Sequence, residues 1–258
     1  MLELALSYDV LAALAAVAFI AGFVDAIAGG GGLLTIPALL TAGLPPHLAL
    51  GTNKLAATFG SATASWTFYR KKLFDPRFWR RSFIATFIGA MIGTLTVSVV
   101  SVDWLDKLLP LLIIAIAVHT LLTRAPKEEQ HQLPTRTPSI LRRQWGQGLS
   151  IGFYDGFAGP GTGAFWTASS MVLYRMNILL SSGLARTMNF ISNATSLGFF
   201  IALGSVNFSL GITMGISLMI GAWIGAHSAI RFGGRFIRPV FITMVMLIAA
   251  KLAWEAWL

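Results

Sequence analysis

Cysteine is absent from this chain of 258 residues, and charged residues make up only 11% of it. Without cysteine, the chain cannot form a disulfide framework, a thiolate metal site or a cysteine nucleophile. The charged fraction lies well below the roughly 25% that is usual in soluble domains. Hydrophobic residues make up 55% of the sequence, and the mean hydropathy is +0.73. This balance predicts a membrane protein that is embedded in a lipid bilayer.

Signatures of several other functions are missing as well. The glycine-rich run GPGTG lacks the GK[ST] ending of a nucleotide-binding loop, and no histidines or carboxylates show metal-ligand spacing. No motif places a nucleophile beside a base. The net charge of +9 lies in short loops between apolar runs, so a nucleic-acid partner is not expected. We therefore expect no enzyme activity, no cofactor and no metal.

Apolar segments account for most of the chain. A helix needs about 20 residues to cross the hydrocarbon core of a bilayer, and six of the segments are long enough. The other four form two adjacent pairs, each interrupted by a glycine-rich run at residues 29–32 or 159–163. The segments are 10–28, 33–44, 48–68, 79–100, 104–122, 145–158, 164–174, 179–203, 208–228 and 238–258.

The sequence contains a duplication. GFVDAIAGGG, which begins at Gly22, recurs 130 residues later as GFYDGFAGPG, so that Asp25 matches Asp155. At an offset of 132 residues, Lys54 matches Arg186, and GAMIG at residues 89–93 matches GAWIG at residues 221–225. A chain with such a repeat is expected to fold as two related halves.

The basic residues predict the topology. Of the 19 lysines and arginines, 15 lie at residues 70–81, 124–143, 175 and 231–238, which the positive-inside rule places in the cytoplasm. For these regions to share one side, each half must begin with a hairpin that enters the membrane and returns, followed by three crossings. An odd number of crossings makes the halves inverted relative to each other, as in many secondary transporters. The alternative, in which segment 10–28 crosses completely, remains open.

The predicted fold is an all-α polytopic membrane protein with two inverted repeats. Each repeat consists of a re-entrant or broken helical hairpin plus three transmembrane helices. The first repeat covers residues 1–123, the second covers residues 145–258, and residues 124–144 form a polar, proline-containing linker. We expect a multi-pass protein of the bacterial inner membrane, with the linker in the cytoplasm and the N-terminus outside.

Four ionisable residues lie inside apolar segments: Asp25, Lys54, Asp155 and Arg186. Each costs about 3 kcal/mol or more near the bilayer centre, so such residues usually face a partner or a cavity. One interpretation is structural, with Asp25 paired to Lys54 and Asp155 paired to Arg186. Because buried ion pairs often stabilise a fold no more than apolar packing does, the other interpretation is direct participation in transport.

The glycine-rich runs predict an anion-binding site. A hairpin that breaks inside the membrane exposes backbone N–H groups and a helix N-terminus, and both favour an anion. We predict that the two hairpin tips face each other, with Lys54 and Arg186 supplying positive charge. Asp25 and Asp155 would pair with these cations or carry a coupling proton or ion. The other candidate substrate-binding residues are Gly29, Gly30, Gly31, Asn53, Gly161, Thr162, Trp166, Asn189 and Asn193.

Two of these signals have a structural alternative. Trp166 directly follows the second glycine-rich run and could cap the pocket, but a packed aromatic residue fits the sequence equally well. The glycines of GAMIG and GAWIG lie on uninterrupted helices, so we expect them in close helix packing of the small-xxx-small kind.

The repeated G-F-x-D-x-x-A-G-x-G element is followed by ALGTNKL in the first half and by LARTMN in the second. In these motifs, and over nearly its whole length, the chain resembles the TauE/SafE family of membrane proteins. The resemblance implies transport of small oxidised-sulfur anions, such as sulfite or organosulfonates, coupled to an ion gradient.

We therefore predict a secondary transporter, or permease, that works by alternating access between the two hairpin tips. Its expected partners are a small anionic substrate, the lipid bilayer and a coupling proton or ion, with a homodimer as one possible assembly. The alternatives are a carrier of a cation or neutral solute that uses Asp25 and Asp155, and a non-transporting membrane scaffold or enzyme.

Overall fold

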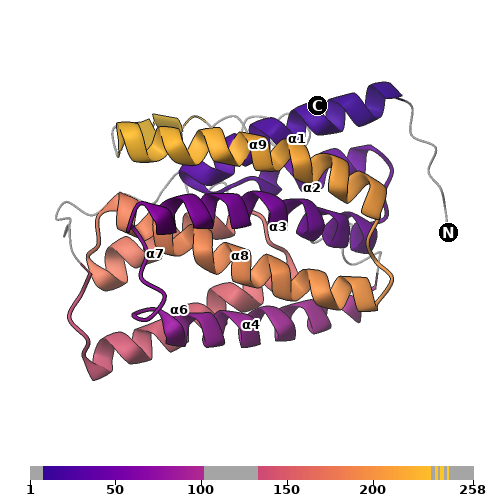
Figure 1. Ribbon diagram of the computed structural model, residues 1–258. Helices are drawn as coiled ribbons and strands as arrows, with labels where there is room; N and C mark the ends of the chain where they lie inside the picture. Colours follow the sequence, from indigo (N-terminus) through magenta and orange to yellow (C-terminus); the bar gives the residue numbers. More distant parts are fainter. Residues whose placement is uncertain (1–7, 102–132, 234–235, 238, 241–242, 244–258) are drawn as a thin grey trace, which may run out of the picture.

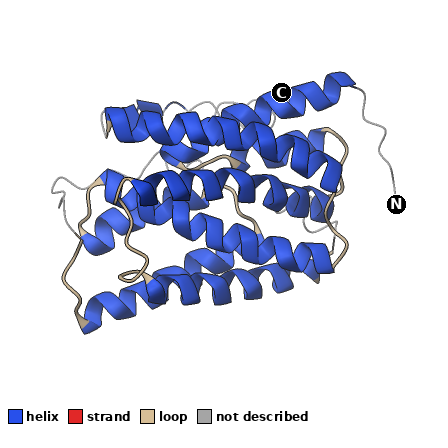
Figure 2. Ribbon diagram, viewed as in Figure 1, coloured by secondary structure: helices blue, strands red, loops and turns tan. Residues whose placement is uncertain are grey.

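The computed structural model describes residues 8–101, 133–233, 236–237, 239–240 and 243. Between residues 8 and 233 the described residues form eight α-helices, which confirms the predicted all-α class (Figures 1 and 2). The predicted segment 104–122 and nearly all of segment 238–258 lie outside the described residues. The helices are α1 (Tyr8–Ala28), α2 (Gly32–Thr41), α3 (Pro46–Arg70), α4 (Arg80–Ser98), α6 (Pro138–Phe157), α7 (Thr162–Tyr174), α8 (Ile178–Ala202) and α9 (Phe208–Phe232).

Three of the described helices, α1, α4 and α9, are long and apolar enough to cross a membrane. With 21 residues, α1 is about 31 Å long at 1.5 Å per residue, close to the thickness of a bilayer's hydrocarbon core. The helices α3, α6 and α8 have 20 to 25 residues, but several of their buried positions are polar. This pattern is that of a polytopic membrane protein that turns its polar residues inward.

The start of α6 differs from the prediction. The helix begins at Pro138 rather than at residue 145, so its first turns occupy the end of the predicted linker. The side chain of Thr137 accepts a hydrogen bond from the backbone N–H of Ile140, and Pro138 fits the first helical turn, where no N–H is needed. A search for apolar runs does not find these turns, because they contain the charged and exposed residues Arg142 and Arg143.

The helices α1 and α2 form a hairpin. The chain turns at Gly29, whose φ of 79° lies in the left-handed region that favours glycine. After the turn, α2 doubles back along α1. Leu39 of α2 and the following Leu44 therefore share an apolar cluster with Leu14 and Ala18 from the first half of α1.

The helices α6 and α7 form a second hairpin. Its turn contains Gly159 and Gly161, with φ of 91° and 74°. At the end of α7, the Tyr174 hydroxyl donates a hydrogen bond to Gln147 Oε1 on α6 at 2.8 Å. Arg143 Nη1, near the start of α6, donates to the carbonyl oxygen of Leu173 at 2.6 Å. Each half of the chain therefore begins with a broken helical pair.

The two hairpins open at opposite ends of the helix bundle. The first hairpin opens where α3 and α9 begin. Ala49 of α3 and Leu210 of α9 belong to the same apolar cluster as the first half of α1 and the last turns of α2. The second opens beyond the end of α3, where Trp79 contacts Tyr174 with ring centroids 4.9 Å apart. The tips of the two hairpins therefore approach each other from opposite directions.

The second of these ends carries the basic residues. Arg136 Nη2 donates to the carbonyl oxygen of Arg77 at 2.7 Å, which joins two of the predicted cytoplasmic regions. Ile237, which follows α9, packs with Phe68 near the end of α3. We call this end the basic end; it holds Arg70, Lys71, Lys72, Arg77, Arg80, Arg81, Arg136, Arg142, Arg143, Arg175 and Arg231. That it faces the cytoplasm stays a prediction.

The two halves exchange helices in a reciprocal way. In Figure 1, α1 and α9 form an upper layer, α4 and α6 a lower layer, and α3 and α8 lie between them. A side chain at Gly89 or Gly93 of α4 would overlap the α6 backbone at Leu149 or Phe153. The GAWIG glycines make the matching contacts with the α1 backbone, and the expected role of these motifs in close helix packing is confirmed.

Candidate functional site

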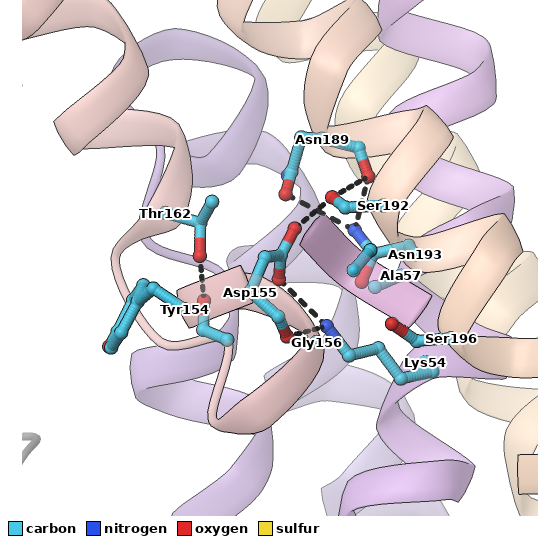
Figure 3. Close-up of polar contacts among 12 residues, drawn as sticks. Lys54, Ala57, Tyr154, Asp155, Gly156, Thr162, Asn189, Ser192, Asn193 and Ser196 are labelled. Atoms are coloured by element: carbon cyan, nitrogen blue, oxygen red, sulfur yellow. Dashed lines mark hydrogen bonds and ion pairs between the residues drawn. The ribbon is translucent and has the colours of Figure 1, made fainter. Parts of the chain in front are cut away.

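The four intramembrane charges form two ion pairs, and each pair joins the two halves. Lys54 Nζ on α3 lies 2.7 Å from Asp155 Oδ1 on α6. Figure 3 shows the two side chains pointing toward each other. Arg186 Nη1 on α8 lies 3.5 Å from Asp25 Oδ2 on α1. The pairing of Asp25 with Lys54 and of Asp155 with Arg186 was therefore the wrong structural interpretation. Because the hairpins enter from opposite ends, each tip region reaches the central helix of the other half.

The first pair is held by several hydrogen bonds. Lys54 Nζ donates to Asp155 Oδ1 and also to the backbone oxygen of Asp155 at 2.5 Å. The Ser192 hydroxyl donates to the other carboxylate oxygen, Oδ2. Both charged side chains are only 2% exposed. Lys54, Asp155 and Ser192, which we call the α3–α6 clamp, thus tie the second hairpin to α3 and α8.

The second pair is looser. All three guanidinium nitrogens of Arg186 are buried, and none has a hydrogen-bond partner among the described residues. Asp25 points its Oδ1 atom at its own hairpin tip, where it accepts the N–H groups of Gly30 and Gly31 at 3.0 Å each. Its side chain is 14% exposed. A buried cation with no hydrogen-bond acceptor is costly, and such a group in a native structure calls for an explanation.

The two glycine-rich tips touch each other at Arg186. A side chain on Gly29 would overlap the backbone of Gly163, and its Cβ would lie 2.5 Å from Arg186 Nη2. In the other half, a Cβ on Gly159 would lie 3.2 Å from Lys54 Nζ. Each cation therefore lies beneath the tip of the opposite hairpin, and only residues without a side chain permit this close approach.

A cavity of about 20 Å³ lies where the tips meet. This volume is about what one water molecule requires. Residues of both halves line it, and eight of them were predicted from the sequence. These eight are Asp25, Gly31, Asn53, Asp155, Gly161, Thr162, Asn189 and Asn193. The cavity is thus a polar space shared by the two hairpins and the two central helices.

Several predicted residues do not line this cavity. Lys54 and Arg186 are paired with the lining residues Asp155 and Asp25 but do not line the cavity themselves. Gly29 and Gly30 contribute backbone to the first tip. Trp166 packs in an apolar cluster with residues such as Leu184 and does not reach the cavity, so the packed alternative describes it.

Thr35 is a cavity residue that sequence reasoning missed. Its hydroxyl oxygen lies 3.1 Å from the carbonyl oxygen of Gly31 and 2.5 Å from Asn53 Oδ1, and its single proton can be donated to either oxygen. Its match at the 132-residue offset is Thr167, whose hydroxyl bonds the carbonyl oxygen of Gly163 at 2.8 Å. Extending the comparison of the halves into α2 and α7 would have found both residues.

Comparison with known proteins identifies the family. The family model described as Sulfite exporter TauE/SafE matches residues 14–252. The chain belongs to the TauE/SafE family. A probable membrane transporter protein of Haemophilus influenzae is 39% identical over 96% of each chain. The probable membrane transporter protein YfcA of Escherichia coli K12 is 37% identical over 93% of this chain and 88% of its own length.

A third relative, the probable membrane transporter protein ORF9 of a Sinorhizobium species, is 36% identical over 96% of this chain. No solved structure matches the chain significantly. Membership of the TauE/SafE family, together with the apolar helices, makes the protein a multi-pass membrane transporter and not an enzyme.

Proposed function

We propose that the protein is a secondary transporter of small oxyanions, such as sulfite or organosulfonates, and that the anion binds where the two hairpin tips meet. The observation that carries this proposal is the buried guanidinium of Arg186, which is paired with Asp25 at 3.5 Å but donates no hydrogen bond to a described residue, beside the N–H groups of a glycine-rich tip. A guanidinium presents parallel N–H donors that match the oxygens of a planar or pyramidal oxyanion, and helix N-termini add further donors. The family description of a sulfite exporter supports the substrate class.

The carboxylate of Asp25 lies where the substrate anion would bind, so the two would compete for the same donors. It accepts both tip N–H groups and is the ionic partner of Arg186, so a substrate oxyanion and the charged carboxylate require the same donors. Protonation of Asp25 would remove that competition and release Arg186 to the substrate. The proton and the anion would therefore bind together, which couples anion movement to a proton gradient.

The arrangement of the halves supports alternating access. The cavity of about 20 Å³ is too small for an oxyanion that is larger than water, so the tips must part before substrate enters. In an inverted repeat, movement of one hairpin would open the site to one side, and movement of its twin would open it to the other. The α3–α6 clamp holds the second hairpin more firmly than Arg186 holds the first.

The proposal can be tested with purified protein in liposomes. We expect uptake of sulfite or an alkyl sulfonate, stimulated by a proton gradient, and little uptake of potassium. Arg186→Ala should abolish flux, and Arg186→Lys should reduce it at least tenfold, because lysine keeps the charge but loses the fork of donors. Undiminished anion flux in Arg186→Ala would overturn the assignment of the site.

One observation favours a second function, the transport of a cation or neutral solute. The cavity wall includes the carboxylate residues Asp25 and Asp155, whereas Lys54 and Arg186 do not line it. On this alternative, Asp25→Asn would abolish flux of sodium or a neutral solute, and anions would not be carried at all. Measuring anion and cation flux in the same liposomes separates the two functions.

A further inference from the structure

A groove of about 590 Å³ lies between α3 and α9 at the basic end, and it shares no lining residue with the cavity at the hairpin tips. Two tryptophans form its walls, Trp66 with 60% of its surface exposed and Trp223 with 55%. The ring of His227 lies beside Trp223, with centroids 4.7 Å apart. Arg70 and Lys71, at the end of α3, also line the groove, together with Ala62, Thr63 and Thr67.

We propose that this groove binds a phospholipid with an anionic headgroup, whose phosphate contacts Arg70 and Lys71 and whose acyl chain follows α9. Basic pockets between membrane helices recognise such headgroups in general, and tryptophan concentrates at the level of the headgroups. The site is independent of the transport function proposed above.

The charges at the groove support an anionic ligand. Arg70 and Lys71 are exposed, and neither forms an ion pair with a carboxylate among the described residues. Asp75, in the loop that follows α3, uses Oδ1 to accept the N–H groups of Arg77 and Phe78. The positive charge at the end of α3 is therefore available to an external phosphate.

The shape of the surface favours a lipid over free phosphate. The groove has the volume of a site for a small organic molecule, and an inorganic phosphate would fill little of it. From Trp223, an exposed apolar stripe runs along α9 away from the basic end and contains Ile220 and Ile216 at helical spacing. This stripe offers an acyl chain continuous contact below the headgroup.

The test uses the full chain purified in detergent and examined by native mass spectrometry with added phosphatidylglycerol or phosphatidylcholine of identical acyl chains. We expect phosphatidylglycerol to remain bound and phosphatidylcholine to dissociate. The variant Arg70→Ala/Lys71→Ala should bind phosphatidylglycerol about tenfold more weakly or worse, as expected for two basic contacts at a membrane surface. The matched control Arg80→Ala/Arg81→Ala removes two exposed charges at the same end, outside the groove, and should bind normally.

Four results would overturn the proposal. They are equal retention of both lipids, equal loss in the control variant, displacement of the lipid by millimolar inorganic phosphate, and a shift from dimer to monomer in the groove variant without loss of lipid. If the double variant does not fold, Lys71→Glu alone should still lower binding of phosphatidylglycerol, since it reverses one charge at the rim.

Discussion

Lys54 and Arg186 occupy equivalent positions in the two halves, but their hydrogen bonding differs. Lys54 carries a compact ammonium group, which donates hydrogen bonds to the carboxylate and the backbone oxygen of Asp155. Arg186 carries more donors, and no described residue accepts a hydrogen bond from them. The first arrangement already gives its cation two acceptors, whereas under the proposed function the second would gain acceptors from a bound oxyanion. We therefore expect Arg186 to respond to substrate more strongly than its twin.

The α3–α6 clamp leads to a prediction at the scale of single residues. Lys54→Met should destabilise the protein by about 3 to 5 kcal/mol, because it leaves the Asp155 carboxylate buried without its cation. The double variant Lys54→Met/Asp155→Asn should regain at least half of the lost melting temperature, since it buries no lone charge. The measurement is thermal unfolding in detergent, and a double variant as unstable as the single one would contradict the clamp.

At the scale of helices, the reciprocal contacts of α1 with α9 and of α4 with α6 place the hairpins. The small residues of GAMIG and GAWIG bring each pair of backbones together, so the first helix of one half is held by the last described helix of the other. The glycines at these contacts are steric requirements, whereas Gly198 on α8 has open space around it.

This difference predicts unequal effects of the same substitution. Gly93→Ala should cost about 1 to 3 kcal/mol, because the new methyl group overlaps the α6 backbone at Phe153. Gly225→Ala should cost a similar amount at the equivalent contact with Phe23. Gly198→Ala should be neutral or stabilising, since alanine favours a helix. Melting temperatures of the three variants decide the matter, and equal losses would contradict the packing described here.

At the scale of the whole molecule, the gathering of basic loops at one end predicts the orientation. Because the chain has no cysteine, single cysteines report topology without interference. Cysteines at Lys72 and Arg142, both exposed at the basic end, should react with an impermeant maleimide only in inside-out vesicles. A cysteine at Thr41, exposed at the opposite end, should react only in intact cells. Labelling of all three from one side would refute the orientation.

The sequence predicted eight residues that line the cavity at the hairpin tips, but it did not predict how the charged residues are paired. Charges and glycines stand out in an apolar chain, so the duplication alone identified Asp25, Asp155 and the two tips. The partner of each charge could not be read from the sequence, since it depends on how two halves meet in space. Ser192 was missed because its match in the first half is Gly60, which carries no hydroxyl. The start of α6 was missed because its first turns carry Arg142 and Arg143, which interrupt the apolar run.

The exchange of helices also has a consequence for synthesis. When the ribosome has completed α1, the surface that this helix needs belongs to α9, which is translated last among the described helices. Until α9 is made, the face of α1 that packs against it should therefore remain exposed to lipid, and the N-terminal portion should be susceptible to quality-control proteases. Fragments 1–130 and 131–258 should each be degraded when produced alone, and should accumulate when produced together in one cell.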